Sequence, residues 1–439
     1  MVGNVRSRRD RVGALSTSQV AAEIASWLAY AHALLAYAHA MVRSPHLASR
    51  LQGFGTTIFA QMSALATETG AVNLGQGFPD TDGPAEVIEA AVSALRSGQN
   101  QYPPLAGITD LRSAIAEHQQ RFWGLTFDPT AEVLVTAGAT EALAASMLAL
   151  CEPGDEVIVF DPTYDCYDAA ISMAGGVIRP VVLRPSADGT FEFDADELGR
   201  AFTSRTRLIL LNTPHNPTGK VFNDTELMLI ATLCVKHDVL AITDEVYEHL
   251  VFDGAHQPLA SFPDMADRTV TVSSGGKTFS FTGWKIGWAC GPQPLIEAIR
   301  TAKQFLTFVN GAPLQPAIAA GLRLDDAYFT DFCSSMLAKR NRLTEQLDAA
   351  GFDVLAPQGT YFLNADVQAA AARVGAPSRS IDFCLDLPRR AGVVAVPSEV
   401  FYQDQDDGQH LVRFCFAKSD ETLDAAGDRL VAAFGRSDA

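Results

Sequence analysis

The sequence predicts an α/β protein, with a large domain whose mainly parallel sheet is flanked by helices and a smaller α+β domain. The first observation is size: a chain of 439 residues, 48% hydrophobic and 19% charged, can bury the cores of two domains. The second is an alternation of short β-branched runs with helical segments from about residue 132 onward, which is typical of a helix-covered parallel sheet. The third is that these runs lack period-two alternation, as expected for strands buried on both faces.

The expected elements follow one another in a regular order. The pattern predicts strands over 132–136, 156–160, 207–211, 239–243 and 269–272, and helices over 139–151 and 224–236. Past about residue 325 it predicts a smaller domain, with helices over 328–350 and 380–391 and strand-like runs at 360–363 and 411–416. Four segments are therefore expected: an N-terminal extension, helical or disordered (1–50), an arm joining the small domain (51–84), a large ligand-binding domain (85–325) and a small C-terminal domain (326–439).

The first fifty residues differ in composition from the rest. Their basic start and the Ala-rich run over 26–40 superficially mimic a secretory signal. Glu23, His32 and His39 interrupt that run, and it is too polar for a membrane span. We therefore expect an upstream extension, with Met41 as the true start, or a surface helix, rather than an export signal.

Charge and cysteine usage narrow the class of protein. The formal net charge of -18 disfavours nonspecific attraction to nucleic acid or to an anionic membrane, because both need a basic face. The seven cysteines are scattered and include no CxxC pair, so neither a disulfide framework nor a metal site is indicated. We expect a cytoplasmic protein without nucleic-acid or membrane partners.

In open α/β sheets, ligands bind beyond the carboxyl ends of the strands, so the residues after each predicted strand are the candidates. Ala139 and Thr140 follow the first strand, in a glycine turn that opens a helix and could hold a phosphate. Such a turn is also ordinary strand-to-helix geometry. Tyr164 follows the next strand and could stack on a planar ring, or could be a half-buried loop residue.

Three further strand ends carry polar residues. Asn216 lies in a Pro- and Asn-dense turn that fixes its amide at a strand end. Asp244, followed by Tyr247, ends an apolar strand, where a carboxylate is costly to bury unless a cation such as a protonated pyridine nitrogen meets it. Lys277 follows Ser274 in a small-residue loop. That lysine could be a surface residue, yet a buried ε-amine with a lowered pKa is what imine formation requires.

Together these residues resemble a known family. The segments 73–80, 212–219, 243–248 and 276–280 are similar to those of class I/II aminotransferases, which are enzymes of pyridoxal 5'-phosphate (PLP) fold type I. The resemblance covers the chain from about residue 53 to the C-terminus. It implies that residues 85–325 are a PLP-binding domain, and that the protein moves an amino group from an amino acid to 2-oxoglutarate by a ping-pong route.

The resemblance also implies a role for each candidate. Lys277 would hold PLP as a Schiff base and move the substrate proton, and Asp244 would keep the pyridine nitrogen protonated. Asn216 and Tyr247 would contact the 3'-oxygen, and Tyr164 would stack on the ring. Arg413 and the backbone of Gly77 would bind the substrate carboxylate, with Asn216 beside them. The implied phosphate ligands are Ala139, Thr140, Ser274, Lys285 and, from the second subunit of a homodimer, Tyr102.

A narrower resemblance concerns the substrate. Lys285 stands where many fold-type members have arginine, and the segment 283–288 is similar to the kynurenine and N-succinyldiaminopimelate aminotransferase branch. The segments 100–104 and 311–316 look closer to bacterial N-succinyldiaminopimelate aminotransferases of lysine biosynthesis. No pattern names the substrate side chain, and Lys303, which could serve an acidic one, is expected to be a surface lysine.

Other functions remain open at this point. Kynurenine or glutamine transamination is the alternative substrate, and cysteine-S-conjugate β-elimination needs the same site geometry. A PLP-binding regulatory module would need a DNA-binding domain, for which the N-terminal fifty residues are too short and too Ala-rich. A catalytically inactive homologue would be expected to lack Lys277 or Asp244, and both are present.

Overall fold

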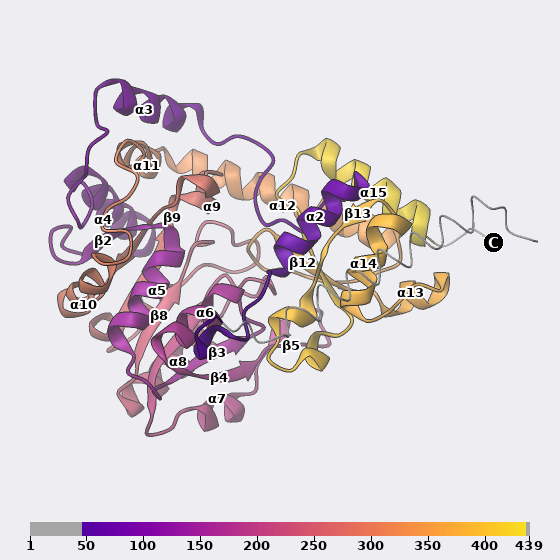
Figure 1. Ribbon diagram of the computed structural model, residues 1–439, viewed down its shortest axis with the longest axis horizontal. Coiled ribbons are helices and arrows are strands. Elements are labelled where there is room, and N and C mark those ends of the chain that lie inside the picture. Colours follow the sequence, from indigo (N-terminus) through magenta and orange to yellow (C-terminus); the bar gives the residue numbers. More distant parts are fainter. Residues whose placement is uncertain (1–45, 436–439) are drawn as a thin grey trace, which may run out of the picture. The chain divides into compact units, whose positions relative to one another are not determined.

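The computed structural model describes residues 46–435 (Figure 1). The chain divides at Thr56 into two compact units. In the first unit the described residues include a short 3-10 helix, η1 (Ser49–Leu51). The predicted extension falls mainly on residues 1–45, which lie outside the described residues. All elements below belong to the second unit, Thr57–Ala439, and the finer boundaries at 84 and 325 stay a prediction.

The central sheet has seven strands within the described residues, in the order β2-β10-β9-β8-β7-β3-β4. β10 is antiparallel to both of its neighbours, and the other adjacent pairs are parallel. This confirms the predicted mainly parallel sheet. The strands are β2 (Val133–Ala137), β3 (Glu156–Asp161), β4 (Val177–Val182), β7 (Thr206–Asn212), β8 (Leu240–Asp244), β9 (Thr269–Ser274) and β10 (Ile286–Cys290).

Two of these strands were not predicted. β4 lies at the sheet edge, is half exposed and contains Pro180, so its apolar signal is weak. β10 begins two residues after the tryptophan of a short 3-10 helix, η4 (Thr282–Trp284), and only Lys285 separates the two.

The strands are buried on both faces, as their unbroken apolar runs predict. In β3, Val157 and Val159 join one hydrophobic core, and Ile158 and Phe160 join another. The first core is closed by α5 (Gly138–Leu150), α6 (Asp165–Ala174) and α10 (Gln293–Lys303), and the second by α7 (Ala195–Ala201) and α8 (Asp224–His237). A third core packs α3 (Ala85–Arg96), α4 (Thr109–Trp123) and α11 (Gln315–Leu322) against β2 and β10.

The smaller lobe holds an antiparallel sheet of four strands in the described part of the chain, ordered β11-β12-β15-β14. The arm adds β1 (Val72–Asn73), which pairs in parallel with β13 (Val393–Val394). Figure 1 shows this lobe at the right of the view, beside the large sheet. Its remaining elements are α2 (Ile58–Thr69), α12 (Asp326–Ala349), β11 (Asp353–Leu355), β12 (Phe362–Asp366), α13 (Gln368–Val374), α14 (Ser380–Arg390), β14 (Val396–Pro397), β15 (Leu411–Cys415) and α15 (Asp420–Phe434).

Two further findings bear on function. Among the described residues, no helix is both long and apolar enough to cross a membrane. The seven cysteines are free thiols, five of them buried and two partly buried.

Candidate active site

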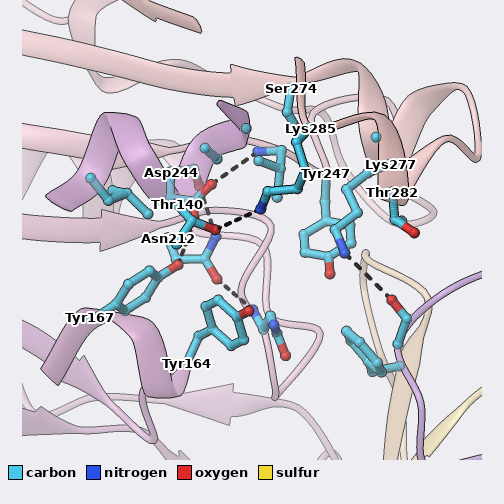
Figure 2. Close-up of a pocket in the computed structure, with 18 of the residues that line it drawn as sticks. Thr140, Tyr164, Tyr167, Asn212, Asp244, Tyr247, Ser274, Lys277, Thr282 and Lys285 are labelled. Atoms are coloured by element: carbon cyan, nitrogen blue, oxygen red, sulfur yellow. Dashed lines mark hydrogen bonds between the residues drawn. The ribbon is translucent and has the colours of Figure 1, made fainter. Parts of the chain in front are cut away.

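A cavity of about 340 Å³ opens where the carboxyl ends of β3, β7, β8 and β9 meet the small lobe. Figure 2 shows the side chains that point into it. The cavity is lined by nearly all of the residues that the sequence singled out: Gly77, Ala139, Thr140, Tyr164, Asn216, Asp244, Tyr247, Ser274, Lys277, Lys285 and Arg413. Tyr102 is not among the lining residues, and its side chain is 82% exposed.

One end of the cavity is an anion cradle. α5 begins at Gly138, whose φ of +72° suits a residue without a side chain. A Cβ at Gly138 would lie 3.0 Å from the Nζ of Lys285, and one at Gly287 would lie 2.4 Å from the carbonyl carbon of Gly138. Lys285 Nζ donates a 3.3 Å hydrogen bond to Thr140 Oγ1. A helix N-terminus, a hydroxyl and an ammonium group therefore converge on one small space.

Asp244 ends β8 and is almost fully buried. One oxygen accepts a 2.7 Å hydrogen bond from the hydroxyl of Tyr167, and the backbone carbonyl accepts one of 2.8 Å from the Asn212 amide. Burial raises the pKa of this carboxyl to about 6, although the Tyr167 hydrogen bond opposes the rise. The ionised form would gain from a cation, and within the described residues Asp244 forms no ion pair.

Lys277 lies in the short helix α9 (Gly275–Thr278), which follows β9 directly. Its Nζ donates to the hydroxyl of Tyr361 at 2.9 Å and lies 3.5 Å from the carbonyl oxygen of Gly77. The Tyr361 hydroxyl donates in turn to that carbonyl at 2.6 Å. Burial lowers the pKa of Lys277 to about 8, so a substantial neutral fraction is present near neutral pH.

Arg413 reaches the cavity from β15 of the small lobe and is 1% exposed. Its Nη1 donates to Asn216 Oδ1 at 2.9 Å, whereas its Nε has no hydrogen-bond partner in the described part of the chain. The guanidinium carbon lies 4.0 Å from the Phe362 ring centre and 5.2 Å from that of Phe59. Burial lowers the pKa of Arg413. A buried guanidinium with a free donor favours an anionic ligand.

The structure adds residues that the sequence did not single out. Phe362 of the small lobe lines the cavity, and its neighbour Tyr361 contacts Lys277. Tyr167 also lines the cavity and lies on α6, one turn beyond the predicted stacker Tyr164. No strand-end rule points to such positions. The expectation that Lys303 is a surface lysine was wrong, because its side chain is fully buried. Its Nζ donates to the carbonyl oxygens of Phe308 at 2.7 Å and Leu105 at 3.4 Å, which satisfy the buried amine.

The donor set fits PLP, which carries a phosphate, a pyridine nitrogen and an aldehyde. The cradle at Gly138 has room for the phosphate because no Cβ fills it. Asp244 supplies a buried carboxylate for a protonated ring nitrogen, and Lys277 supplies a partly buried amine for the aldehyde. The partly buried Tyr164 and the buried Tyr247 add two phenols, whose pKa values are both raised by burial, so both remain hydrogen-bond donors.

Comparisons with known proteins agree with this arrangement. The family model described as "Aminotransferase class I and II" matches residues 69–430. A probable N-succinyldiaminopimelate aminotransferase of Mycobacterium tuberculosis is 51% identical over 391 residues, covering 87% of this chain and 97% of that protein. The methionine aminotransferase of Escherichia coli is 40% identical over 383 residues, covering 87% and 97%. Human kynurenine–oxoglutarate transaminase 1 is 39% identical over 412 residues, with the same coverage.

The solved structures give the same picture. The structure of N-succinyldiaminopimelate aminotransferase from Mycobacterium tuberculosis superimposes with a TM-score of 0.85 at 51% identity, covering 88% of this chain and all of that one. Both the predicted fold and the predicted enzyme class are thereby confirmed. The chain belongs to the class I and II aminotransferases, and it is a transaminase whose cofactor is pyridoxal phosphate.

Proposed function

We propose that this transaminase acts on N-succinyl-LL-diaminopimelate and passes its amino group to 2-oxoglutarate by a ping-pong mechanism. The support for this substrate is the 51% identity to the mycobacterial enzyme of that name, against 40% and 39% for the methionine and kynurenine enzymes. The observation that carries the reaction itself is the presence in one cavity of a partly buried amine, Lys277, and a buried guanidinium, Arg413, that forms no ion pair within the described residues.

We propose which side chains would contact each part of the cofactor. Ala139, Thr140, Ser274 and Lys285 would hold the phosphate at the start of α5. Asp244 would accept a hydrogen bond from the ring nitrogen and keep it protonated, because a buried carboxylate gains most from a buried cation. Asn216 and Tyr247 would donate to the 3'-oxygen, and Tyr164 would lie against the ring. When bound, the cofactor supplies an electron-withdrawing ring that stabilises negative charge at the substrate Cα.

The substrate contacts come from the small lobe and the arm. Arg413 would bind the α-carboxylate, with Asn216 and the backbone of Gly77 beside it. This contact with the carboxylate would fix the orientation of the substrate Cα–H bond. Lys277 would then take the Cα proton, because its lowered pKa leaves part of the amine neutral at the working pH. The Tyr361 hydroxyl, 2.9 Å from Nζ, would hold the amine toward the carboxylate end of the cavity.

We also propose that the protein is a homodimer in the cytoplasm. Tyr102 and Phe305 are each 82% exposed, and the Tyr102 ring lies 5.6 Å from that of Phe308. Exposed aromatic side chains of this kind support burial against a second copy. In that dimer Tyr102 would contact the phosphate of the partner's cavity. Sedimentation of the wild type and of Tyr102→Ala tests the assembly, and a monomeric wild type would contradict it.

A second substrate class is favoured by the lining of the cavity. Phe59 and Phe362 flank Arg413 and offer an apolar surface to the substrate side chain. Such a surface suits kynurenine, glutamine or methionine as well as a long acylated side chain. The same geometry would permit β-elimination from a cysteine conjugate, because its Cβ carries a leaving group.

One experiment separates these substrates. The cofactor-loaded protein is mixed in turn with N-succinyl-LL-diaminopimelate, kynurenine, methionine and glutamate, without a 2-oxo acid. Loss of the cofactor's long-wavelength absorption band reports the first half-reaction, and 2-oxoglutarate should restore it. We expect the succinylated substrate to have the highest ratio of rate to half-saturation. A higher ratio for kynurenine or methionine would replace the proposed substrate, and pyruvate release from a cysteine conjugate would reveal β-elimination.

A further inference from the structure

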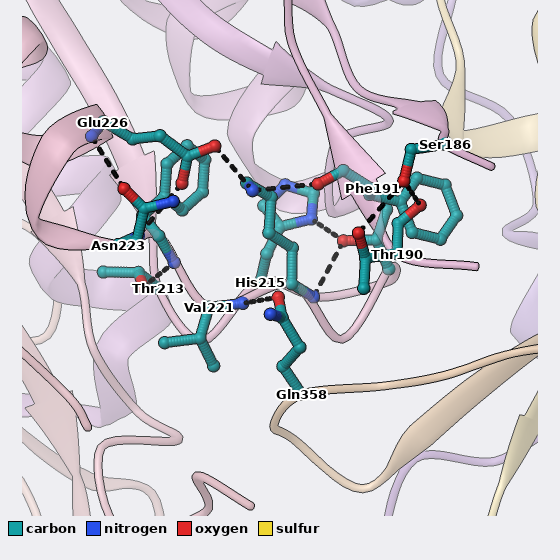
Figure 3. Close-up of polar contacts among 12 residues, drawn as sticks. Ser186, Thr190, Phe191, Thr213, His215, Val221, Asn223, Glu226 and Gln358 are labelled. Atoms are coloured by element: carbon teal, nitrogen blue, oxygen red, sulfur yellow. Dashed lines mark hydrogen bonds and ion pairs between the residues drawn. The ribbon is translucent and has the colours of Figure 1, made fainter. Parts of the chain in front are cut away.

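The turn that carries Asn216 into the cavity is held from its far end by a buried lysine. The turn follows β7 and contains two cis peptide bonds, Thr213-Pro214 and Asn216-Pro217. Lys220, four residues after Asn216, is 5% exposed. Figure 3 shows polar contacts around this turn, with His215, Val221, Glu226 and Phe191 labelled.

Lys220 ties the turn to two other elements. Its Nζ forms an ion pair of 2.8 Å with Glu226 Oε1, in the first turn of α8, and donates to the carbonyl oxygen of Phe191 at 2.8 Å. Phe191 begins β6 (Phe191–Glu192), and the ring of Phe222 lies 5.2 Å from Nζ. A buried ammonium is costly without such partners, so this lysine fixes the turn against the large lobe.

Inside the turn, short hydrogen bonds connect the backbone of Lys220 to the residues around Asn216, so they fix the position of Asn216. The amide of His215 donates to the carbonyl of Lys220 at 2.8 Å, and the amide of Gly219 donates to that of His215 at 2.7 Å. His215 Nδ1 and Thr218 Oγ1 are 2.8 Å apart. Burial lowers the pKa of His215 to about 3, so its ring stays neutral in the working range of pH. The Asn216 amide donates to Asn212 Oδ1 at 2.6 Å, which ties the turn back to the end of β7.

The same turn also meets the lobe that carries Arg413. The amide of Val221 donates to Gln358 Oε1 at 3.1 Å, and the amide of Gly359 donates to the carbonyl of Gly219 at 2.8 Å. At the cavity, Asn216 Oδ1 accepts the 2.9 Å hydrogen bond from Arg413. The turn is therefore a continuous link from the Lys220–Glu226 ion pair to the guanidinium.

We propose that Lys220 is a positioning residue for substrate binding: its ion pair with Glu226 holds the turn so that Asn216 and Arg413 align on the substrate carboxylate. This inference rests on the carboxylate-binding role proposed above for Arg413. Lys220 touches neither substrate nor cofactor, and it acts through the turn.

The test uses the cofactor-loaded enzyme and the variant Lys220→Met, which keeps the volume of the side chain and removes the charge. Three quantities are measured: the half-saturation and the limiting rate of the half-reaction with L-glutamate, and the dissociation constant of glutarate by calorimetry. Glutarate carries carboxylates but no amino group to transfer. We expect both the half-saturation and the glutarate dissociation constant to rise about tenfold, with the limiting rate changed less than about threefold. Lys220→Arg should recover most of the affinity.

The matched control is Asn223→Ala. Asn223 and Glu226 form the capping box of α8, so this variant weakens the same helix start but leaves the Lys220–Glu226 ion pair in place. It should lower the unfolding temperature without changing glutarate binding. If Lys220→Met does not fold, Glu226→Gln replaces it, because the amide keeps the size of the side chain and removes the charge.

Three results would overturn the inference. Unchanged glutamate half-saturation and glutarate affinity in the lysine variant would show that Lys220 serves stability alone. An equal loss of glutarate affinity in Asn223→Ala would also show that Lys220 serves stability alone. If Arg413→Lys binds glutarate as tightly as the wild type, the failure lies in the carboxylate role of Arg413, and the inference falls with it.

Discussion

The end of β8 and the turn that follows it contribute side chains to two buried clusters that behave differently. Asp244 and Tyr247 line the cavity, whereas Glu245 and Glu248 join what we call the His/Glu cluster: Glu245, Glu248, His118, His249 and His256. In that cluster, Glu245 pairs with His256 at 2.8 Å, and His118 contacts His249 at 2.8 Å. Glu248 accepts hydrogen bonds from Trp123 at 2.6 Å and Ser273 at 2.8 Å.

The two clusters differ in where their charges find partners. In the His/Glu cluster, Glu245 hydrogen-bonds His256 and Glu248 accepts from Trp123 and Ser273, although Glu245 Oε1 and the Nδ1 atoms of His118 and His256 have no hydrogen-bond partner in the described part of the chain. In the cavity, Lys277, Asp244 and Arg413 form no ion pairs within the described residues. Burial without a counter-charge is expensive, and it persists where a ligand supplies the missing charge. The type of buried residue therefore says less about function than whether its partners are already present.

The largest effect should come from Lys277→Ala. Because the cofactor loses its amine partner and the substrate loses its proton acceptor, transamination should fall by about 10³-fold or more. The cofactor's long-wavelength absorption band should be lost as well. The cofactor-free variant should unfold at the same temperature as the wild type or higher, because a buried ammonium has been removed. Retention of the band would contradict the assignment of Lys277.

A pair of neutralising substitutions compares the two clusters directly. Asp244→Asn should lower the limiting rate by about 10²-fold, because an amide cannot hold the ring nitrogen in its protonated form. Glu248→Gln, four residues along the same turn, should leave the rate within a few-fold of the wild type. The limiting rates of both variants and of the wild type are compared at saturating cofactor. Equal losses in both variants would mean that the His/Glu cluster takes part in the reaction.

The pH dependence of stability should distinguish Glu248 in the cofactor-free protein. Burial raises its pKa to about 7, although the charge of His256 and the hydrogen bond from Ser273 oppose the rise, and Glu245 adds to it. The folded state then binds a proton that the unfolded state releases above its ordinary pKa, so stability falls as pH rises from about 4.5 to 7. Urea unfolding at pH 5 and 7.5 should show Glu248→Gln gaining up to about 3 kcal/mol on the wild type over this range. A gap that does not change with pH would contradict the raised pKa.

The same contrast shows what could be read from the sequence. The mainly parallel sheet followed from runs such as Val157–Phe160 that pack on both faces, and the strand-end rule found Asn216, Asp244 and Lys277. Tyr361 could not be found this way, because it reaches Lys277 from the other lobe, 84 residues away in the chain. Lys303 was misjudged because its partners are backbone carbonyls, which leave no mark in the sequence. Side chains that depend on contact between lobes need the folded structure.

The smallest effect should come from Tyr361→Phe. The hydroxyl donates to the Gly77 carbonyl, so its oxygen accepts from Lys277 Nζ and favours the charged amine. Its removal should lower the pKa of Lys277 further below its usual range, by less than about one unit. The rate at which added cofactor develops its absorption band depends on the neutral amine, so the midpoint of its pH profile should move down. Tyr328→Phe is the matched control, because the hydroxyl of this partly buried residue donates to the carbonyl of Thr278 at 2.8 Å rather than contacting Lys277. A midpoint that moves up in Tyr361→Phe, or moves equally in both variants, would show that the hydroxyl does not tune Lys277.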